Sequence, residues 1–390
     1  MKTLYLHIGT PKTGTSSIQA FLRKNRKLLA KRSYGFPLMP FTYPSVPIQR
    51  NGHFLMVTSP FLEKTSSDSY AAPPKTNERW KKNYSEGLAT LHREFESYDN
   101  VILSEERLWN AIYYDPISFL SFLPEDAAAN NYCIKIVVYL RRQDLFLTSL
   151  WNQRVKATKS GETLPEYLDN LAVRKPLYAD YEQTLQTLSD VFGTENIIVR
   201  RFEPDSWIDH SLTTDFLAAI GMDYSLRFQP PKHTANPSLN GNALEIQRLI
   251  NRSELLSNAE KLDLSTYMKA IPESTQAGRA YQHLSVEESA ALLANYREGN
   301  NRVAEIYLRD GLPLFSDEIR ETPMWQQENK EMLADTMRLF LTVTHDQYVR
   351  NQNLIKENNA LNKEVKKLQV FREKVQHPAR TIKNKIFKNR

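Results

Sequence analysis

Residues 4–22 read Leu-Tyr-Leu-His-Ile-Gly-Thr-Pro-Lys-Thr-Gly-Thr-Ser-Ser-Ile-Gln-Ala-Phe-Leu and predict a strand, a loop and the start of a helix. The apolar run from Leu4 to Ile8 is typical of a buried strand, and a helical periodicity follows the loop. Gly9 and Gly14 lie in that loop. A glycine-containing loop at a helix N-terminus aims backbone N–H groups and the positive end of the helix dipole at one point. The stretch therefore predicts a binding site for a phosphate-bearing cofactor.

The two glycines have the spacing of a Walker A loop, G-x-x-x-x-G-K-[ST], but the lysine does not. Thr15 follows Gly14, and the lysine lies inside the loop as Lys12. A nucleoside triphosphatase needs that lysine to reach the β and γ phosphates of its substrate. ATP hydrolysis is therefore disfavoured, and a nucleotide-dependent, kinase-like P-loop enzyme remains as the weaker alternative.

The string from Pro11 to Ser16 resembles the 5′-phosphosulfate loop of sulfotransferases that use 3′-phosphoadenosine 5′-phosphosulfate (PAPS). The resemblance implies that Lys12 contacts the oxygen that bridges phosphate and sulfate and stabilises the charge of the leaving group. The implied cofactor-binding residues of the loop are Pro11, Lys12, Thr13, Gly14, Thr15, Ser16 and Ser17. An ordinary strand-to-helix turn with an N-cap is the alternative interpretation.

A second motif lies at residues 134–153, where a Val- and Ile-rich strand pattern ends in Arg141-Arg142 and a helical pattern follows. It resembles the 3′-phosphate motif of the same family, in which an arginine closes a strand and a serine follows eight positions later. The resemblance implies that Arg141 and Ser149 bind the 3′ phosphate of PAPS. A phosphomonoester carries about two negative charges and matches a forked donor together with a hydroxyl. Arg142 has two alternatives, an ion pair with Asp144 or exposure to solvent.

Two shorter strings resemble a bacterial branch of the family that acts on carbohydrates. They are Arg141-Arg142-Gln143-Asp144 and Asn152-Gln153-Arg154-Val155-Lys156. The whole resemblance covers about residues 1–315. It implies transfer of a sulfuryl group from PAPS to a hydroxyl of a glycan or glycolipid, in polysaccharide biosynthesis. Outside the enzyme class, the alternative is a catalytically inactive protein that works as a coiled-coil scaffold.

Transfer to a hydroxyl needs a general base that reaches the acceptor, and related enzymes use glutamate or histidine. Glu105 follows the strand-like run 101–103 and is expected at the same sheet edge as both cofactor motifs. Its alternative role is to complement a helix dipole. His53 lies in a proline-rich stretch where an acceptor would dock, and its alternative is an exposed loop histidine. Lys12, Glu105 and His53 are therefore the candidate catalytic residues, with Glu105 preferred as the base.

Strand and helix patterns alternate along the first part of the chain and predict an α/β fold. Strand-like runs occur at residues 4–8, 101–103, 134–140 and 196–199, and helical patterns at 16–31, 86–97 and 145–156. Such alternation favours a P-loop-like parallel β-sheet flanked by helices, with the cofactor at the carboxyl ends of the strands. We expect one sulfotransferase domain at residues 1–325.

Two segments of that domain have their own expected roles. Residues 35–85 are rich in proline and keep no period for long, so they form either a wall of the acceptor site or a plain surface excursion. Residues 236–320 return to helical periodicity and are expected to form a helical cap.

Residues 328–376 carry a heptad pattern. The apolar a and d positions are Leu333, Met337, Phe340, Leu354, Leu361, Val365 and Leu368, and polar residues at Thr344, Gln347, Asn351 and Asn358 interrupt the seam. This pattern predicts either a homo-oligomeric coiled coil or one long helix packed on its own body, and it favours the coiled coil.

Charge and composition limit the partners. The chain has 390 residues, a net charge of +6 and a single cysteine, Cys133, so no disulfide can form within it. Residues 372–390 hold seven basic residues and one acidic residue, which account for the whole excess charge. A nearly neutral body argues against binding of nucleic acid. The basic tail, residues 377–390, is expected to contact an anionic membrane surface peripherally, and a merely solvated tail is the alternative interpretation.

The sequence lacks the patterns of a metal site, a membrane span and a signal peptide. No Cys/His cluster has the spacing of a metal site, and no apolar run has the length of a membrane span or the form of a signal peptide. We therefore expect PAPS as the cosubstrate without a metal ion, and a cytoplasmic location that includes the inner face of the membrane.

Overall fold

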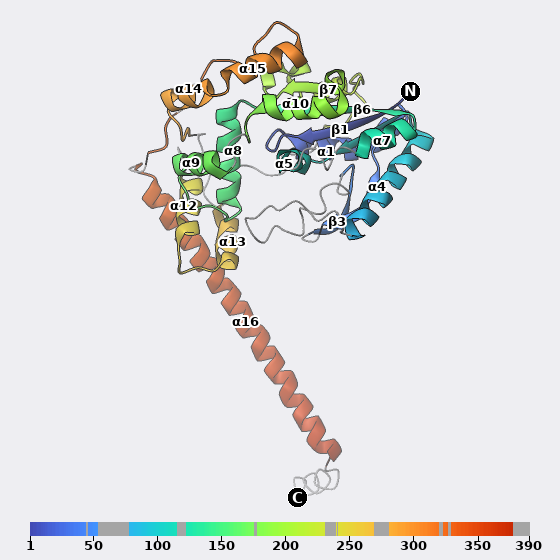
Figure 1. Ribbon diagram of the computed structural model, residues 1–390. Coiled ribbons are helices and arrows are strands. Elements are labelled where there is room, and N and C mark those ends of the chain that lie inside the picture. Colours follow the sequence, from blue (N-terminus) through green and yellow to red (C-terminus); the bar gives the residue numbers. More distant parts are fainter. Residues whose placement is uncertain are drawn as a thin grey trace, which may run out of the picture. The chain divides into compact units, whose positions relative to one another are not determined.

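The computed structural model of the chain divides into two compact units, Met1–Leu239 with Ala280–Trp325 and Asn240–Arg279 with Gln326–Arg390. The structure describes residues 1–43, 46–53, 78–114, 122–174, 178–230, 239, 241–268, 281–319, 323–326 and 329–376 (Figure 1). Most of the proline-rich stretch and the whole basic tail, residues 377–390, lie outside the described residues. The roles expected of them therefore stay predictions.

A parallel five-stranded sheet forms the centre of the first unit (Figure 1). The strands are β1 (Lys2–Gly9), β2 (Tyr34–Gly35), β5 (Asn100–Ser104), β6 (Tyr132–Leu140) and β7 (Ile197–Arg201). Their order across the sheet is β2-β5-β1-β6-β7, and every neighbouring pair is parallel. The four predicted strands and the parallel α/β class are confirmed. The strand β2 is too short to leave a period in the sequence.

Helices connect these strands. Those of the first unit are α1 (Thr15–Lys24), α2 (Arg26–Ala30), α4 (Glu78–Ser97), α5 (Arg107–Tyr114), α7 (Phe122–Ala129), α8 (Gln143–Lys156), α9 (Leu164–Arg174), α10 (Tyr181–Phe192), α11 (Leu212–Ala219), α14 (Val286–Ala294) and α15 (Arg297–Val303). Short 3-10 segments lie at Thr194–Asn196, Pro204–Ser206 and Ile208–His210, and a π-helical segment lies at Ala304–Leu308.

The helix predicted over residues 16–31 is interrupted at Asn25. The Asn25 side chain donates hydrogen bonds to the carbonyls of Phe21 and Gln229 at 2.9 Å each, and it accepts one from the Gln229 N–H at 2.9 Å. These bonds tie the end of α1 to a distant segment, and α2 begins at Arg26. The helix predicted from residue 86 begins earlier, at Glu78.

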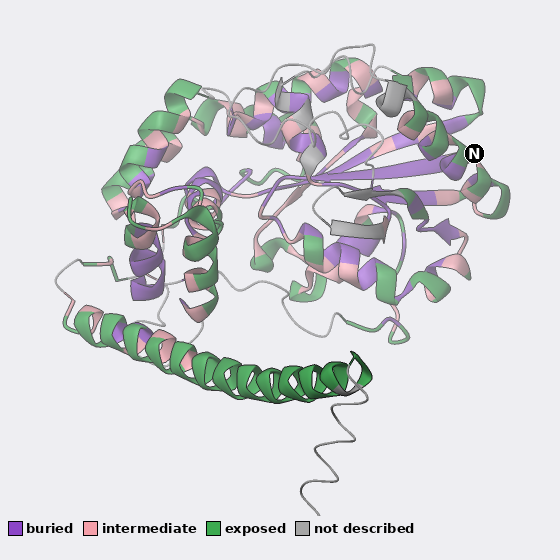
Figure 2. Cartoon of the chain, turned by 90° about the horizontal axis from the view of Figure 1, so that it is seen from below, coloured by how far each residue is buried: buried purple, intermediate pink, exposed green. Residues whose placement is uncertain are grey.

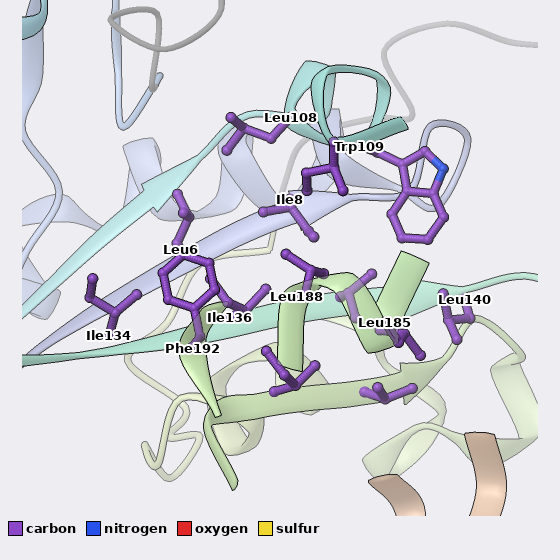
Figure 3. Packing of buried hydrophobic residues seen from close by; sticks show 14 of the residues in the cluster. Leu6, Ile8, Leu108, Trp109, Ile134, Ile136, Leu140, Leu185, Leu188 and Phe192 are labelled. Atoms are coloured by element: carbon purple, nitrogen blue, oxygen red, sulfur yellow. The ribbon is translucent and has the colours of Figure 1, made fainter. Parts of the chain in front are cut away.

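The side chains of the strands divide the core into two clusters, one on each face of the sheet. Leu4, Leu6 and Ile8 of β1 pack with α4, α5, α7 and α10. Tyr5 of the same strand packs with α1, α2 and α11. Figure 3 shows part of the first cluster, in which Leu185 of α10 lies against the sheet. Because both faces are covered, the strands carry largely continuous apolar runs in place of an alternating pattern.

The chain path places a switch point between β1 and β6. The connections that follow β1 lead to β5 and β2 on one side of the sheet, whereas those that follow β6 lead to β7 on the other side. At such a point the two connections diverge and leave a crevice at the carboxyl ends of the strands, where ligands bind in open α/β sheets. The loop after β1 and the arginines after β6 both lie at this edge.

The proline-rich stretch, residues 35–85, holds more regular structure than expected. The strands β3 (Leu38–Tyr43) and β4 (Val46–Asn51) pair antiparallel, and α4 begins within the stretch. Residues 54–77 lie outside the described part of the chain.

The second unit consists of α12 (Gly241–Arg252), α13 (Asn258–Tyr267) and the long helix α16 (Met332–Gln376). The helices expected in one cap at residues 236–320 therefore divide, because α14 and α15 group with the sheet. Within the second unit, the Asn242 side chain donates to Asp335 of α16 at 2.9 Å, and the Tyr267 hydroxyl donates to Asp346. The first part of α16 thus packs on its own body, which is the second of the two alternatives for the heptad region.

Candidate active site

The loop after β1 is held by hydrogen bonds to the neighbouring strand. The N–H and the hydroxyl of Thr10 both donate to the Tyr139 carbonyl of β6, each at 3.1 Å. The Thr13 hydroxyl donates back to the Thr10 carbonyl at 2.5 Å. Lys12 and Gly14 adopt left-handed backbone conformations, with φ of 68° and 74°. These features fold the loop into a closed turn at the carboxyl edge of the sheet.

The start of α1 offers donors to an anion. Gly14 precedes the helix without a side-chain cap, and the first turn holds no acidic residue. In that turn the Ser17 N–H already donates to the Gly14 carbonyl at 2.8 Å, whereas the N–H groups of Thr15 and Ser16 precede the first bond of the helix and point out of its start. The Thr15 hydroxyl is buried and has no hydrogen-bond partner among the residues that the structure describes. A buried hydroxyl without a partner is costly, so an oxygen of a bound phosphate suits this position. The donor set therefore fits a phosphate group.

Lys12 lies half-buried within a cluster of charges. Burial lowers the pKa of its ammonium group, Glu106 raises that pKa, and Arg141 and Lys156 lower it further. Two cations, Arg141 and Lys156, thus act on the Lys12 ammonium group, and a concentration of positive charge at one place attracts an anion. Lys156 is absent from the predicted site residues. Its signal was its place at the end of the Asn-Gln-Arg-Val-Lys string of α8.

Arg141 meets the loop directly. Its Nη1 donates to the Lys12 carbonyl at 3.4 Å, and its guanidinium carbon lies 5.7 Å from the centre of the Phe202 ring. The Tyr181 hydroxyl donates to the Arg141 carbonyl at 2.6 Å, which fixes the turn after β6. Burial lowers the pKa of Arg141. The structure therefore brings the two predicted motifs together, although 129 positions separate Lys12 from Arg141.

Arg142 and Ser149, the other predicted residues of the second motif, have different surroundings. Arg142 forms an ion pair with Asp144, with Nε–Oδ1 and Nη2–Oδ2 distances of 2.9 and 3.0 Å, and it also donates to the carbonyls of Ser316 and Glu318. Of its two alternatives, the ion pair is the one observed. Ser149 lies half-buried on α8, and no hydrogen bond joins it to Arg141 in the described structure. Arg142 is thus occupied, whereas Arg141 faces the loop.

The two candidate bases form one pair. His53 Nδ1 lies 3.0 Å from Glu105 Oε2, and the exposed fractions of these residues are 4% and 2%. The interpretation of His53 as an exposed loop histidine is therefore wrong. In the tautomer with a proton on Nδ1, His53 donates to the carboxylate and keeps Nε2 as its basic nitrogen. A pair of this kind can take up a proton from an acceptor hydroxyl.

Backbone bonds fix this pair beside the loop. The Glu105 N–H donates to the His7 carbonyl of β1 at 2.9 Å, and the Ser104 N–H donates to the Gly52 carbonyl at 2.5 Å. The segment that carries His53 is thus fastened to the end of β5, next to the strand that leads into the Lys12 loop. Lys12, Glu105 and His53 share the carboxyl edge of the sheet.

A buried polar cluster lies under the pair and was missed in the sequence. His7 Nδ1 lies 2.8 Å from the Ser104 hydroxyl, and Gln19 Nε2 donates to the carbonyl and the hydroxyl of Ser104 at 3.1 and 3.2 Å. Burial lowers the pKa of His7 to about 3, so it is neutral at pH 7. The cluster links β1, β5 and α1 directly beneath the candidate site. A histidine and a glutamine at core positions of a strand and a helix were its only sequence signals.

The described part of the chain offers neither a metal site nor a membrane-spanning helix. No group of three His, Cys, Asp or Glu residues in the described ranges could hold a metal ion. Among the helices that the structure describes, none is both long enough and apolar enough to cross a membrane.

Comparisons with known proteins gave distant likenesses. No family model matches the chain. A protein of Archaeoglobus fulgidus, described as uncharacterized, is 28% identical over 207 residues, which are 53% of this chain and 53% of that protein. The match thus spans about half the length of that relative. A crystal structure described as a sulfotransferase from Alicyclobacillus acidocaldarius aligns with 18% identity and a TM-score of 0.36, and covers 61% of this chain and 87% of the other. None of these likenesses assigns the chain to a family.

Proposed function

We propose that this protein is a sulfotransferase that transfers a sulfuryl group from PAPS to a hydroxyl acceptor. The observation that carries the proposal is the meeting of Lys12 and Arg141 at the switch point of the sheet, with Arg141 Nη1 3.4 Å from the Lys12 carbonyl. Each residue belongs to a motif that resembles one of the two phosphate-binding motifs of PAPS-dependent enzymes. A ligand with phosphates at both ends of its ribose would engage both motifs.

The residues present fit such a ligand. The N–H groups at the start of α1 and the buried Thr15 hydroxyl would hold the 5′ phosphate. Arg141 and Ser149 would hold the 3′ phosphate. When bound, PAPS would supply the sulfuryl group, and its adenosine bisphosphate part would be the leaving group.

Lys12 would act on the charge of the leaving group. Negative charge grows on the oxygen that links phosphate to sulfur as that bond breaks, and an ammonium group there lowers the barrier. Burial lowers the pKa of Lys12 in this structure, but a phosphate beside it would favour the charged form. The loop would then present a cation at the position where charge develops.

The Glu105–His53 pair would accept the proton of the attacking hydroxyl. Glu105 stays our first candidate for the base, with His53 bonded to it at 3.0 Å. If Glu105 is the base, Glu105→Gln should lower kcat by about 10²-fold, and His53→Gln should have a smaller effect. The reverse order would assign the base to His53.

The acceptor is proposed from resemblance alone. The Gln143-Asp144 and Asn152-to-Lys156 strings resemble the bacterial carbohydrate branch, which favours a glycan or glycolipid as the acceptor. A place in polysaccharide biosynthesis on the inner side of the membrane belongs to the same proposal. The kinase-like alternative is weaker because Thr15 stands where a Walker A loop has its lysine.

Calorimetric titration with 3′-phosphoadenosine 5′-phosphate (PAP) tests the cofactor. We expect removal of the 3′ phosphate from the ligand to weaken binding about 10- to 100-fold. Arg141→Ala should weaken PAP by a similar factor but leave the ligand without a 3′ phosphate nearly unchanged, because the two changes remove the same contact. Lys31→Ala, at an exposed lysine after α2, is the control. Equal binding of ATP and PAP would contradict the proposal.

A further inference from the structure

The long helix α16 has two parts that differ in burial. Near its start, Asp335 and Leu339 are buried and the helix packs on α12 and α13. From Asn351 to Glu373 every residue is exposed, which Figure 2 shows as a continuous green helix. A helix without tertiary contacts gains little stability from propensity alone. The helix propensity of the exposed part of α16 therefore accounts for little of its stability.

The heptad pattern of the exposed part has a specific composition. Its d positions are Leu354, Leu361, Leu368 and Val375, and its a positions are Asn351, Asn358, Val365 and Arg372. The apolar members of this set are 48% to 66% exposed. Leucine at d with a β-branched residue at a favours two strands over three or four, and an asparagine at a fixes register and strand number.

We propose that residues 351–376 of two copies of this chain form a parallel, in-register, two-stranded coiled coil. In that arrangement Asn351 faces Asn351 of the second copy and Asn358 faces Asn358, so the amides hydrogen-bond to each other across the seam. In an antiparallel pair the a layers face d layers, and Asn358 would lie against a leucine. A buried amide without a partner is unfavourable, so the asparagines select the parallel form.

The charges that flank the seam point to the same arrangement. The g positions hold Glu357, Glu364 and Phe371, and the e positions that follow the two glutamates hold Asn362 and Gln369. In a parallel pair each g residue faces the following e residue of the other copy, so each glutamate meets an amide. In an antiparallel pair g residues face g residues, and glutamates would repel. The occupant that fits the seam is therefore a second copy of this chain.

Molar mass in solution tests the association. Light scattering over a range of concentrations should give the mass of a dimer for the full chain. Leu361→Glu combined with Leu368→Glu should give a monomer, with a dissociation constant raised at least about 100-fold, because both charges fall in the seam. Val370→Glu is the matched control, since Val370 is 51% exposed on the opposite side of the helix and should leave the dimer intact.

Disulfide trapping tests the direction of the two strands. In a Cys133→Ser background, Leu361→Cys should cross-link to itself under mild oxidation, because equivalent d residues are adjacent in a parallel pair. Val370→Cys should not cross-link. A dimer that fails to cross-link at position 361 would overturn the parallel form. A chain that stays monomeric at every concentration would overturn the proposal. A dimer that persists in the Leu361→Glu, Leu368→Glu variant would overturn it as well, and either result would favour a different partner for the seam.

Discussion

The candidate site and the exposed part of α16 use polar residues in opposite ways. At the site, Glu105, His53 and His7 are buried and held by hydrogen bonds among themselves and with a residue of β5 that is in turn bonded to α1. Along α16, Asn351 and Asn358 are exposed on the seam, and the Asn358 side chain accepts a hydrogen bond from Asn362 of the same helix at 3.4 Å. Buried polar groups need hydrogen-bond partners from within the fold. Exposed polar groups are hydrated and remain available to a second molecule. Substitutions should therefore disturb the site through chemistry and stability, and α16 through association.

The largest expected effect comes from Lys12. Lys12→Ala should lower kcat with PAPS by about 10²- to 10³-fold, because it removes the cation at the leaving oxygen. The midpoint of thermal unfolding should change little, since Lys12 is only half-buried and sits in a loop. Steady-state assays beside Lys31→Ala check this. Turnover within twofold of the unchanged protein would remove Lys12 from its role.

Glu105→Gln is the next largest change, and it separates chemistry from binding. We expect about 10²-fold lower kcat while the Kd for PAP stays within twofold, because the amide keeps the shape of the pair but cannot take a proton. Turnover assays and calorimetry on the same preparation measure both quantities. A parallel loss of PAP binding would show that Glu105 serves the cofactor pocket instead.

Two glycines with nearly the same φ separate the cost of backbone strain from the cost of packing. Gly14 has φ of 74°, and a Cβ there would lie 2.4 Å from Leu212 Cδ2, whereas Gly311 has φ of 75° with no atom within 4 Å. Gly311→Ala should cost about 1 kcal/mol from backbone strain alone. Gly14→Ala should cost about 1 to 3 kcal/mol, because Leu212 must also move, and it should weaken PAP. Denaturant unfolding measures both, and equal costs would contradict the packing argument.

The buried histidine makes the stability of the folded chain depend on pH. Burial holds the pKa of His7 at about 3 in the folded chain, against an ordinary value of 6.5. As pH falls from about 6.5 towards about 3, the unfolded chain takes up this proton and the folded chain does not. The free energy of unfolding should therefore fall by about 1.4 kcal/mol per pH unit from His7 alone. Above pH 6.5 His7 should contribute no slope.

Denaturant unfolding at several pH values, with His7→Gln as the comparison, checks this slope. The variant loses stability outright, so the slope with pH is the quantity to compare. Equal slopes in both proteins would mean that His7 can bind its proton in the folded state.

The smallest expected effect is that of shortening the chain from Asn351. Because Asp335 and Asp346 bond to α12 and α13, a cut before α16 would expose that packing, whereas a cut at Asn351 preserves it. Turnover of a small acceptor should stay within about twofold, while the dimer dissociates. A loss of turnover would show that association through α16 supports the site.

Much of the site was predictable because its parts are local. The order strand, glycine loop, helix in residues 4–22 fixes a turn with N–H donors whatever surrounds it, and the run before Arg141 fixes a buried strand. Two parallel strands that end in such turns meet at one edge of a sheet, so Lys12 and Arg141 were expected together. The heptads of α16 are equally local, and they predicted one helix.

Tertiary structure decided the pairings between distant residues. The sequence offered His53 and Glu105 as competing bases, but the fold bonds them to each other, because the segment after β4 is fastened to the end of β5. The sequence left the partner of Arg142 open. In the fold, Arg142 forms an ion pair with Asp144 and donates to two distant carbonyls. The fold also divides the helices of the expected cap between two units. Periodicity reports the environment of each element, whereas a contact between residues far apart depends on how the elements pack, which no local pattern encodes.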